Sequence, residues 1–303
     1  MNILMTGASG FLGGALVPFL TRGGHRISRL VRSRPDAAQG RILWDPAAGK
    51  LNASELEGFE AIVHLSGETI AQRWTAKRKQ RIYDSRIQST RLLVETLTGL
   101  SRPPQVLVAA SAIGYYGDRG DEVVREDSPP GSLWLSRLCR DWEAATRPAS
   151  PQGLRVVNLR FGIILSPEGG ALAPMLLPFR LGLGGRVGSG RQWMSWIALD
   201  DVLGVVQHAL SAPTLAGPVN VVAPHPVTNR EFTQTLGRVL GRPAVFPLPA
   251  GLARLVLGEM ANELLLASAR VAPARLQETQ YAFRFTELEA ALRVLLGKPG
   301  GQA

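Results

Sequence analysis

The stretch NILMTGASGFLG, residues 2–13, decides the fold of this 303-residue chain. Its first five residues form a short apolar run that predicts a β-strand, and apolar residues at helical spacing from Phe11 to Leu20 predict a helix. Between them lie Gly7, Gly10 and Gly13. A strand, a glycine-rich turn and a helix in this order are typical of a dinucleotide site, because a pyrophosphate must reach backbone N–H groups that a Cβ would shield. We therefore expect dinucleotide binding here; the alternative is a purely structural turn.

The end of the second expected strand, residues 25–31, indicates which dinucleotide binds. An acidic residue there would accept hydrogen bonds from the ribose 2′-hydroxyl of NAD. The sequence has Val31-Arg32-Ser33-Arg34 instead, and two guanidinium groups beside a hydroxyl suit a 2′-phosphate. NADP(H) is therefore expected in preference to NAD(H), unless these arginines only decorate a loop of an arginine-rich chain.

Further strand-like runs at 41–44, 60–66, 105–111 and 154–160 alternate with helix-like stretches. This alternation predicts an α/β fold with a Rossmann-like, doubly wound parallel sheet and a smaller, mostly helical C-terminal substrate-side region. Ligands of such sheets lie beyond the carboxyl ends of the strands, which selects the loops 64–68 and 111–117 as site loops. Gly67 would let the backbone pass close to the cofactor, whereas His64 is interpreted as a packed strand residue.

Three regions are expected along the chain. Residues 1–165 form the NAD(P)-binding domain, with its sheet completed by parts of 193–225; residues 166–250 form the substrate side, and 251–303 a helical C-terminal domain. The glycine-rich loop 182–191 is interpreted either as a lid or phosphate cradle, in which Arg186 and Arg191 bind a substrate anion, or as a flexible connector.

Composition excludes several classes of protein. The balance of 34 Lys+Arg against 24 Asp+Glu gives a net charge of +10, but the cations are mostly arginines spread along the chain, which makes nucleic acid an unlikely partner. One cysteine and four scattered histidines match no structural metal site. Without an apolar run near ~18 residues or a leader sequence, we expect a cytoplasmic protein with no membrane partner, as a monomer or homodimer.

Several segments together resemble one family. They are GASGFLG (7–13), VHLSGE (63–68), SAIGYYGDRGD (111–121), CRDWEAA (139–145), RFGIIL (160–165), GGRVGSGRQWMSWI (184–197) and NVVAPHPVTNREFTQTLGRVLGRPAVFPLPA (220–250). The chain resembles, over essentially its whole length, the nucleoside-diphosphate-sugar epimerase-like proteins, an atypical extended group of the short-chain dehydrogenases/reductases with a C-terminal epimerase-associated domain of unknown function.

The resemblance implies a set of cofactor-binding residues that agrees with the glycine-rich turn and the site loops. Together with their neighbours on these loops, the expected cofactor-binding residues are Thr6, Gly7, Gly10, Phe11, Leu12, Gly13, Arg32, Leu65, Ser66 and Gly67. No metal ligand is implied.

One departure from the superfamily concerns catalysis. Active members carry Tyr-x-x-x-Lys on the helix after the serine-bearing strand, where the tyrosine exchanges a proton with the substrate oxygen and the lysine lowers the pKa of that tyrosine. Here these positions fall near Leu135 and Cys139. We expect Ser111, Tyr115 and Tyr116 to act as catalytic residues instead. Arg137 and Arg140 are candidate cations beside them.

Three functions follow from these patterns. The first is an NADP(H)-dependent oxidoreductase or epimerase that acts on a sugar nucleotide or a similar polar carbonyl or carbinol compound. The second is a catalytically degenerate NADP(H)-binding sensor or interaction protein, suggested by the missing Tyr-x-x-x-Lys pair. The third is a nucleic-acid-binding relative of reductases, suggested only by the net charge.

Overall fold

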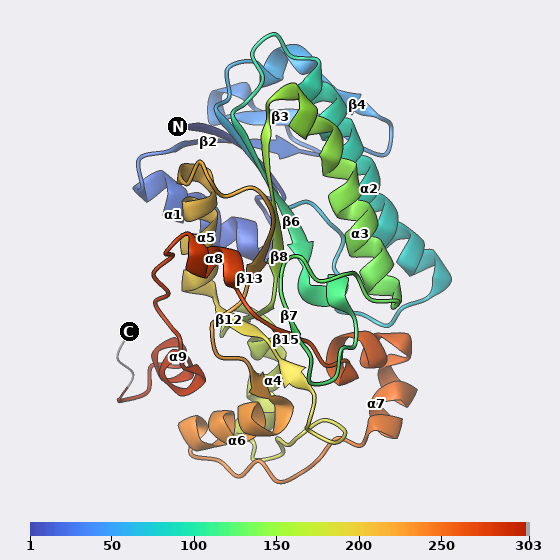
Figure 1. The fold of residues 1–303 in the computed structure, drawn as a ribbon, viewed down its shortest axis with the longest axis vertical. Helices are drawn as coiled ribbons and strands as arrows, with labels where there is room; N and C mark the ends of the chain where they lie inside the picture. The colour runs from blue at the N-terminus through green and yellow to red at the C-terminus, as the bar shows by residue number, and fades with distance from the viewer. Residues whose placement is uncertain (301–303) are drawn as a thin grey trace.

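The computed structural model describes residues 1–300, and its first half alternates strands with helices (Figure 1). The elements of this half are β1 (Asn2–Thr6), α1 (Phe11–Arg22), β2 (Arg26–Val31), β3 (Arg41–Asp45), β4 (Lys50–Leu51), β5 (Ala61–His64), α2 (Ala76–Thr98), β6 (Val106–Ala112), β7 (Val123–Val124), α3 (Trp134–Thr146) and β8 (Arg155–Phe161). Those of the second half are β9 (Ile163–Ser166), β10 (Gly169–Gly170), α4 (Leu172–Arg180), β11 (Trp193–Met194), β12 (Trp196–Ala198), α5 (Leu199–Ser211), β13 (Gly217–Val221), β14 (Val227–Thr228), α6 (Asn229–Leu240), α7 (Ala250–Leu257), β15 (Arg270–Val271), α8 (Ala274–Glu278) and α9 (Leu288–Leu295).

The main sheet has eight strands in the order β13-β8-β6-β5-β1-β2-β3-β4. All neighbouring strands from β13 to β3 are parallel, and only the short β4 is antiparallel. The chain starts at the centre with β1, and the strand order reverses between β1 and β5. This arrangement confirms the expected doubly wound, Rossmann-like sheet and places a ligand crevice at the carboxyl ends of these two strands.

Helices cover both faces of the sheet because the strands are apolar on both sides. On one face Leu16 and Leu20 of α1 pack with Val202 of α5 against the sheet. On the other face Leu93 and Leu97 of α2 are buried beneath the strands. Within residues 1–300 no helix is long and apolar enough to span a membrane.

The second half of the chain returns to the main sheet and also builds a separate layer. Strand β13 pairs with β8 at the sheet edge, so part of the predicted 193–225 segment does complete the sheet. A three-stranded sheet, in the order β10-β9-β12, packs with α4, α6 and α9 around the buried rings of Trp196, Phe232 and Phe285. Helix α6 begins with a capping box in which the Thr228 and Glu231 side chains bond each other's backbone N–H groups.

The C-terminal segment also contacts the first half directly. This contact is made by strand β15, which pairs with β7. Within the second half, the Asp201 carboxylate of α5 accepts hydrogen bonds from the backbone N–H groups of Arg284 and Phe285. The division into 1–165, 166–250 and 251–303 stays a prediction.

Candidate cofactor and substrate site

The glycine-rich turn after β1 requires glycine at two positions for steric reasons. Gly7 has a φ of +68°, and a Cβ on it would lie 2.7 Å from the carbonyl carbon of Leu65. A Cβ on Gly13 would lie 2.3 Å from the carbonyl oxygen of Gly7. The turn is therefore drawn tightly against both α1 and the loop after β5.

The N-terminus of α1 is open to an anion. Its N-cap is Gly10, no side chain caps it, and no acidic residue lies in its first turn. The first N–H groups of a helix lack partners within the helix and carry its positive dipole end. This end of α1 therefore has the chemistry expected for a pyrophosphate site.

The Thr6 side chain holds the loop after β5, including Ser66, against the end of β1. The Thr6 hydroxyl accepts hydrogen bonds from the N–H groups of Leu65 (3.1 Å) and Ser66 (3.2 Å), and it is completely buried. It also lies 2.8 Å from Nδ1 of His64. The Thr6 side chain thus fixes the position of the loop after β5, and the Leu65 backbone lies against Gly7.

His64 is a buried, uncharged residue of β5, as its strand position suggested. Its ring nitrogens bond the hydroxyls of Thr6 and Thr90 (2.9 Å for Thr90), and burial lowers the pKa of His64 to about 4. The imidazole therefore stays neutral near pH 7.

The low pKa of His64 predicts a loss of stability in acid. Unfolding restores a pKa near 6.5, so the unfolded chain binds a proton in a pH range where the folded chain does not. The contribution is complete above pH 6.5 and is lost as the pH falls toward 4, by about 3 kcal/mol in total. Urea unfolding of the wild type and of His64→Gln across this range measures it, since other acid-titrating groups cancel in the difference. If the free energies of unfolding of the two proteins changed with pH in parallel, the low pKa of His64 would be wrong.

Phe11 and Leu12 begin α1 and face different surroundings. The Phe11 ring lies directly over the β9–β10 turn, where a Cβ on Gly169 would approach the ring to 2.3 Å. Leu12 is partly buried against the main core. Phe11 thus connects the glycine-rich turn with the three-stranded sheet.

Arg32 lies at the carboxyl end of β2 with its side chain exposed. Arg34 follows in the left-handed region, with a φ of 55°. Among residues 1–300, neither guanidinium pairs with a carboxylate. Both charges are therefore available to a ligand at this strand end.

Arg86 is a site residue that the sequence interpretation missed. A Cβ on Gly67 would lie 3.0 Å from the guanidinium carbon of Arg86. Nη1 of this arginine donates to the carbonyl oxygens of Glu68 and Ile82, and the group lies 5.0 Å from the centre of the Trp142 ring. The sequence did contain one signal for it: Ile82, Arg86 and Thr90 are four residues apart, which puts all three on the inward face of α2.

Leu135 and Cys139 occupy the face of α3 that packs on the loop after β6. A Cβ on Gly114 would lie 3.3 Å from Cβ of Leu135 and 3.9 Å from Sγ of Cys139. Burial raises the pKa of the Cys139 thiol to about 12. The carboxylate of Glu263 accepts hydrogen bonds from the N–H groups of Trp134 and Leu135, which caps α3 from the C-terminal region. Neither Leu135 nor Cys139 can relay a proton.

Two of the three predicted catalytic hydroxyls belong to an internal network. Ser111 is buried and donates to Glu143 at 2.7 Å. Tyr116 is completely buried; its hydroxyl donates to Asn220 at 2.6 Å and accepts from Arg160 at 2.8 Å. Burial raises the pKa of Tyr116 to about 12, against the opposing effect of the Arg160 charge. Both hydroxyl protons are engaged within the protein.

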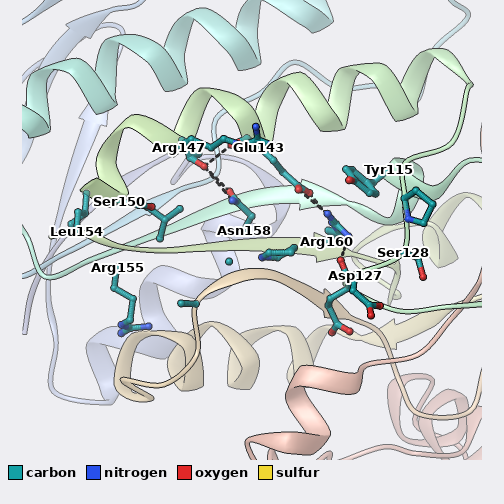
Figure 2. A pocket seen from close by; sticks show the side chains of 17 residues that line it. Tyr115, Asp127, Ser128, Glu143, Arg147, Ser150, Leu154, Arg155, Asn158 and Arg160 are labelled. Atoms are coloured by element: carbon teal, nitrogen blue, oxygen red, sulfur yellow. Dashed lines mark hydrogen bonds and ion pairs between the residues drawn. The ribbon is translucent and has the colours of Figure 1, made fainter. Parts of the chain in front are cut away.

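Tyr115, the third predicted catalytic residue, is half-buried and lies at a groove of about 510 Å³ (Figure 2). Its ring stacks on the Arg160 guanidinium at 3.6 Å. The groove runs along β8 beside α3, and Asn158 of β8 and Glu143 of α3 are among the residues that line it (Figure 2). The predicted cofactor residues do not line this groove.

The glycine-rich loop 182–191 is fixed on both sides. Asn229 accepts from the N–H of Val187 at 2.8 Å, and Gln192 donates to the Val187 carbonyl. Arg186 folds over Gly190 toward Arg230, and both line a second cavity of about 440 Å³. Arg191 is exposed and does not line this cavity. At this cavity Arg186 therefore lies with Arg230, and not with Arg191.

The sequence matches two family models. That of the NAD dependent epimerase/dehydratase family covers residues 3–222, and that of the domain of unknown function DUF1731 covers residues 248–295. Epimerase family protein Mb2239 of Mycobacterium bovis is 42% identical over 299 residues, covering 98% of each chain. Human epimerase family protein SDR39U1 is 40% identical over 300 residues, covering 98% of this chain and all of its own.

Solved structures are similar as well. The crystal structure of human SDR39U1 (isoform 2) with NADPH has a TM-score of 0.89 at 38% identity and covers 98% of this chain and 99% of that one. The nucleoside-diphosphate sugar epimerase of Corynebacterium glutamicum has a TM-score of 0.81 at 37% identity; the match covers 98% of this chain and 58% of the other.

Proposed function

Because this chain belongs to the NAD-dependent epimerase/dehydratase family, we propose that it is an NADP(H)-dependent oxidoreductase or epimerase acting on a sugar nucleotide or a similar polar carbonyl or carbinol compound. The observation that carries the proposal is the uncapped N-terminus of α1, held against Leu65 by glycines that tolerate no side chain. The similar human protein, crystallised with NADPH, supports the choice of nucleotide.

The preference for NADP(H) over NAD(H) rests on Arg32 and Arg34. The ribose next to the adenine would lie at the carboxyl end of β2, where these exposed guanidinium groups have no carboxylate partner among residues 1–300. A 2′-phosphate would accept charge-assisted hydrogen bonds there, whereas a 2′-hydroxyl would find no acidic acceptor.

When bound, a nicotinamide supplies hydride exchange with the substrate carbon, in one direction for a reductase and with return to the opposite face for an epimerase. Arg86 would hold a fixed positive charge beside Gly67, close to the superfamily's lysine position. Its charge already opposes the rise in the pKa of Cys139, which occupies that position. We assign Arg86 the electrostatic part of the role that lysine has in Tyr-x-x-x-Lys enzymes.

The proton step is assigned to the loop 111–117. Tyr115 is the candidate donor, since its hydroxyl has no hydrogen-bond partner in residues 1–300. Ser111 bonds Glu143 and Tyr116 bonds Arg160, which holds this ion pair in place against the Tyr115 ring. The substrate would lie between this loop and residues 166–192, where Arg186 and Arg191 remain the predicted anion-binding residues.

Replacing Arg32 tests the nucleotide assignment. We expect Arg32→Ala to lower the preference for NADPH over NADH at least tenfold, since a hydrogen bond to a charged group contributes about 1.5–3 kcal/mol. Fluorescence titration of nucleotide-stripped protein with both cofactors measures this ratio. Arg22→Ala, at the exposed end of α1, is the matched control and should leave it unchanged. An unchanged ratio in Arg32→Ala would remove the 2′-phosphate assignment.

The catalytic part of the proposal needs a separate readout. NADPH oxidation, or NADP⁺ reduction, is followed with saturating cofactor over a panel of sugar nucleotides and carbonyl compounds. Turnover of one compound supports the proposal. Tight NADPH binding without any turnover would favour the alternative of an NADP(H)-binding protein that has lost catalysis.

A further inference from the structure

Two segments of the chain contain arginines but no acidic residue. Residues 172–192 carry Arg180, Arg186 and Arg191, and residues 232–258 carry Arg238, Arg242 and Arg254, without one Asp or Glu. These segments include α4, most of α6 and α7, which lie together at the lower end of the molecule in Figure 1. The two segments themselves are therefore basic, although Glu231 and Glu259 lie directly at their ends and Arg238 pairs with Glu289.

The same segments expose most of the large apolar side chains found at the surface. Eleven large hydrophobic side chains are exposed among residues 1–300, and eight of them lie in the two segments. We call these eight the apolar face: Leu177, Leu181, Leu183, Val245, Phe246, Leu252, Leu255 and Val256. Their exposed fractions reach 74% at Leu255 and 69% at Val245. Such a concentration marks an interaction surface, whereas isolated exposed apolar residues do not.

Backbone hydrogen bonds hold the two segments side by side. The N–H of Phe246 donates to the Gly184 carbonyl at 3.1 Å, and the N–H of Leu248 donates to the Arg186 carbonyl at 2.9 Å. The loop after α4 therefore runs beside residues 245–248, and α7 begins two residues later. Within α7 only Ala253 is buried, so this helix directs its apolar stripe outward.

Helix α7 has the pattern of a helix that lies at an interface. Leu252, Leu255 and Val256 follow the i, i+3, i+4 spacing that places side chains on one face. In a soluble protein this face would normally point to the core. Exposed apolar stripes flanked by arginine are typical of helices that lie in the plane of a membrane surface.

A cavity of about 440 Å³ borders the apolar face at Val245. Arg186 and Arg230 line it, and neither pairs with a carboxylate among residues 1–300. The hydroxyl of Thr233, which also lines it, is buried and has no hydrogen-bond partner in the described part of the chain. Two guanidinium groups without a carboxylate partner suit the phosphate of a lipid headgroup, and that of Arg186 is held in place by the carbonyl oxygens of Gly188 and Ser189.

The arginines around the apolar face favour an anionic partner. In a symmetric dimer the same patch would meet itself, so arginines would lie against arginines without intervening carboxylates. An anionic bilayer instead complements the arginines and accepts the apolar side chains. We propose that the apolar face, with Arg180, Arg186, Arg230, Arg242 and Arg254 around it, docks this protein peripherally on an anionic phospholipid surface. This proposal departs from the expectation of no membrane partner. It shares only Arg186 with the proposed catalytic function, and no step of it requires that function.

Vesicle flotation tests the proposal with the full-length protein. Vesicles of phosphatidylcholine alone are compared with vesicles containing 30% phosphatidylglycerol. We expect the anionic vesicles to bind the protein at least tenfold better, with the advantage falling in high salt. Leu255→Asp should lower binding to the anionic vesicles at least tenfold, and Arg242→Glu at least fivefold, since a basic residue near such a surface contributes about 1 kcal/mol, or a factor of about five.

Matched variants separate this surface from general stickiness. Leu43→Asp replaces an exposed apolar side chain on β3, and Arg22→Glu reverses an exposed charge on α1; both should bind vesicles as the wild type does. NADPH titration confirms that every variant is folded. Equal binding to neutral and anionic vesicles, no binding at all, or equal losses in the control variants would overturn the proposal. So would a wild-type dimer in light scattering that Leu255→Asp dissociates.

Discussion

The Gly13→Ala variant should bind NADPH at least a hundredfold more weakly than the wild type. A single methyl group is enough, because the new Cβ would lie 2.3 Å from the carbonyl oxygen of Gly7 and 2.7 Å from Cα of Ala8. Both are backbone atoms of the turn, so the turn itself must move away from α1. A displaced turn no longer aims the first N–H groups of α1 at the pyrophosphate, and a hundredfold loss corresponds to about 2.7 kcal/mol. Fluorescence titration of the nucleotide-stripped variant measures it.

The neighbouring glycine provides a sharp control. Gly14 also lies in α1, but a Cβ on it would meet no atom within 4 Å. Gly14→Ala should therefore keep its NADPH affinity and gain about 0.5–1 kcal/mol of stability, since alanine favours a helix over glycine. Helix propensity alone predicts the same gain at Gly13. Similar affinities in the two variants would show that the turn does not form the nucleotide site.

The glycine-rich turn could be predicted from the sequence because its chemistry is local. Glycine spacing, the preceding apolar strand and the following helix lie within twenty residues, and each constrains the next. The parallel sheet followed from the same kind of pattern, repeated along the chain. The position of Arg32 after the second strand is set by the order of the elements in the same way, and its role in binding stays a prediction.

The remaining site residues depend on contacts that are distant in sequence. Arg86 approaches Gly67 only because α2 packs across the loop after β5. Glu263 caps α3 from 128 residues further along the chain. Arg186 turns toward Arg230 because α6 lies beside its loop. Local spacing contains no information on which of the many arginines face one another.

Ser111 shows how a one-residue extension of a strand changes the interpretation. The expected strand ended at residue 111, which put the serine at the boundary between the strand and the following loop. Strand β6 in fact continues through Ala112, paired with Phe161 of β8. Ser111 therefore lies within the pleat and directs its hydroxyl to Glu143 on α3. Strand ends are set by tertiary pairing as well as by local preference.

Replacing Arg160 should cause the largest loss of stability. Arg160 is 2% exposed; its Nε and Nη2 donate to the two Glu143 carboxylate oxygens at 2.8 Å, and Nη1 donates to the Tyr116 hydroxyl. Arg160→Met removes the guanidinium and leaves the Glu143 carboxylate buried without its counter-charge. Breaking such a buried pair lowers the free energy of unfolding by about 3–5 kcal/mol. Denaturant unfolding measures the change.

The exposed pair of Arg140 and Asp141 is the matched control on the neighbouring helix. Its ions lie 3.1 Å apart with side chains that are 52% and 33% exposed, so Arg140→Met should change stability by about 0.5 kcal/mol or less. The double variant Arg160→Met with Glu143→Met should recover much of the loss, because no unpaired charge is left inside. If it does not recover, the loss comes from the contacts of Arg160 with Tyr115 and Tyr116. In that case Arg160 stabilises the loop 111–117 chiefly through its contacts with the two tyrosine rings. The charge of Glu143 then matters less for the position of Tyr115, the proposed proton donor.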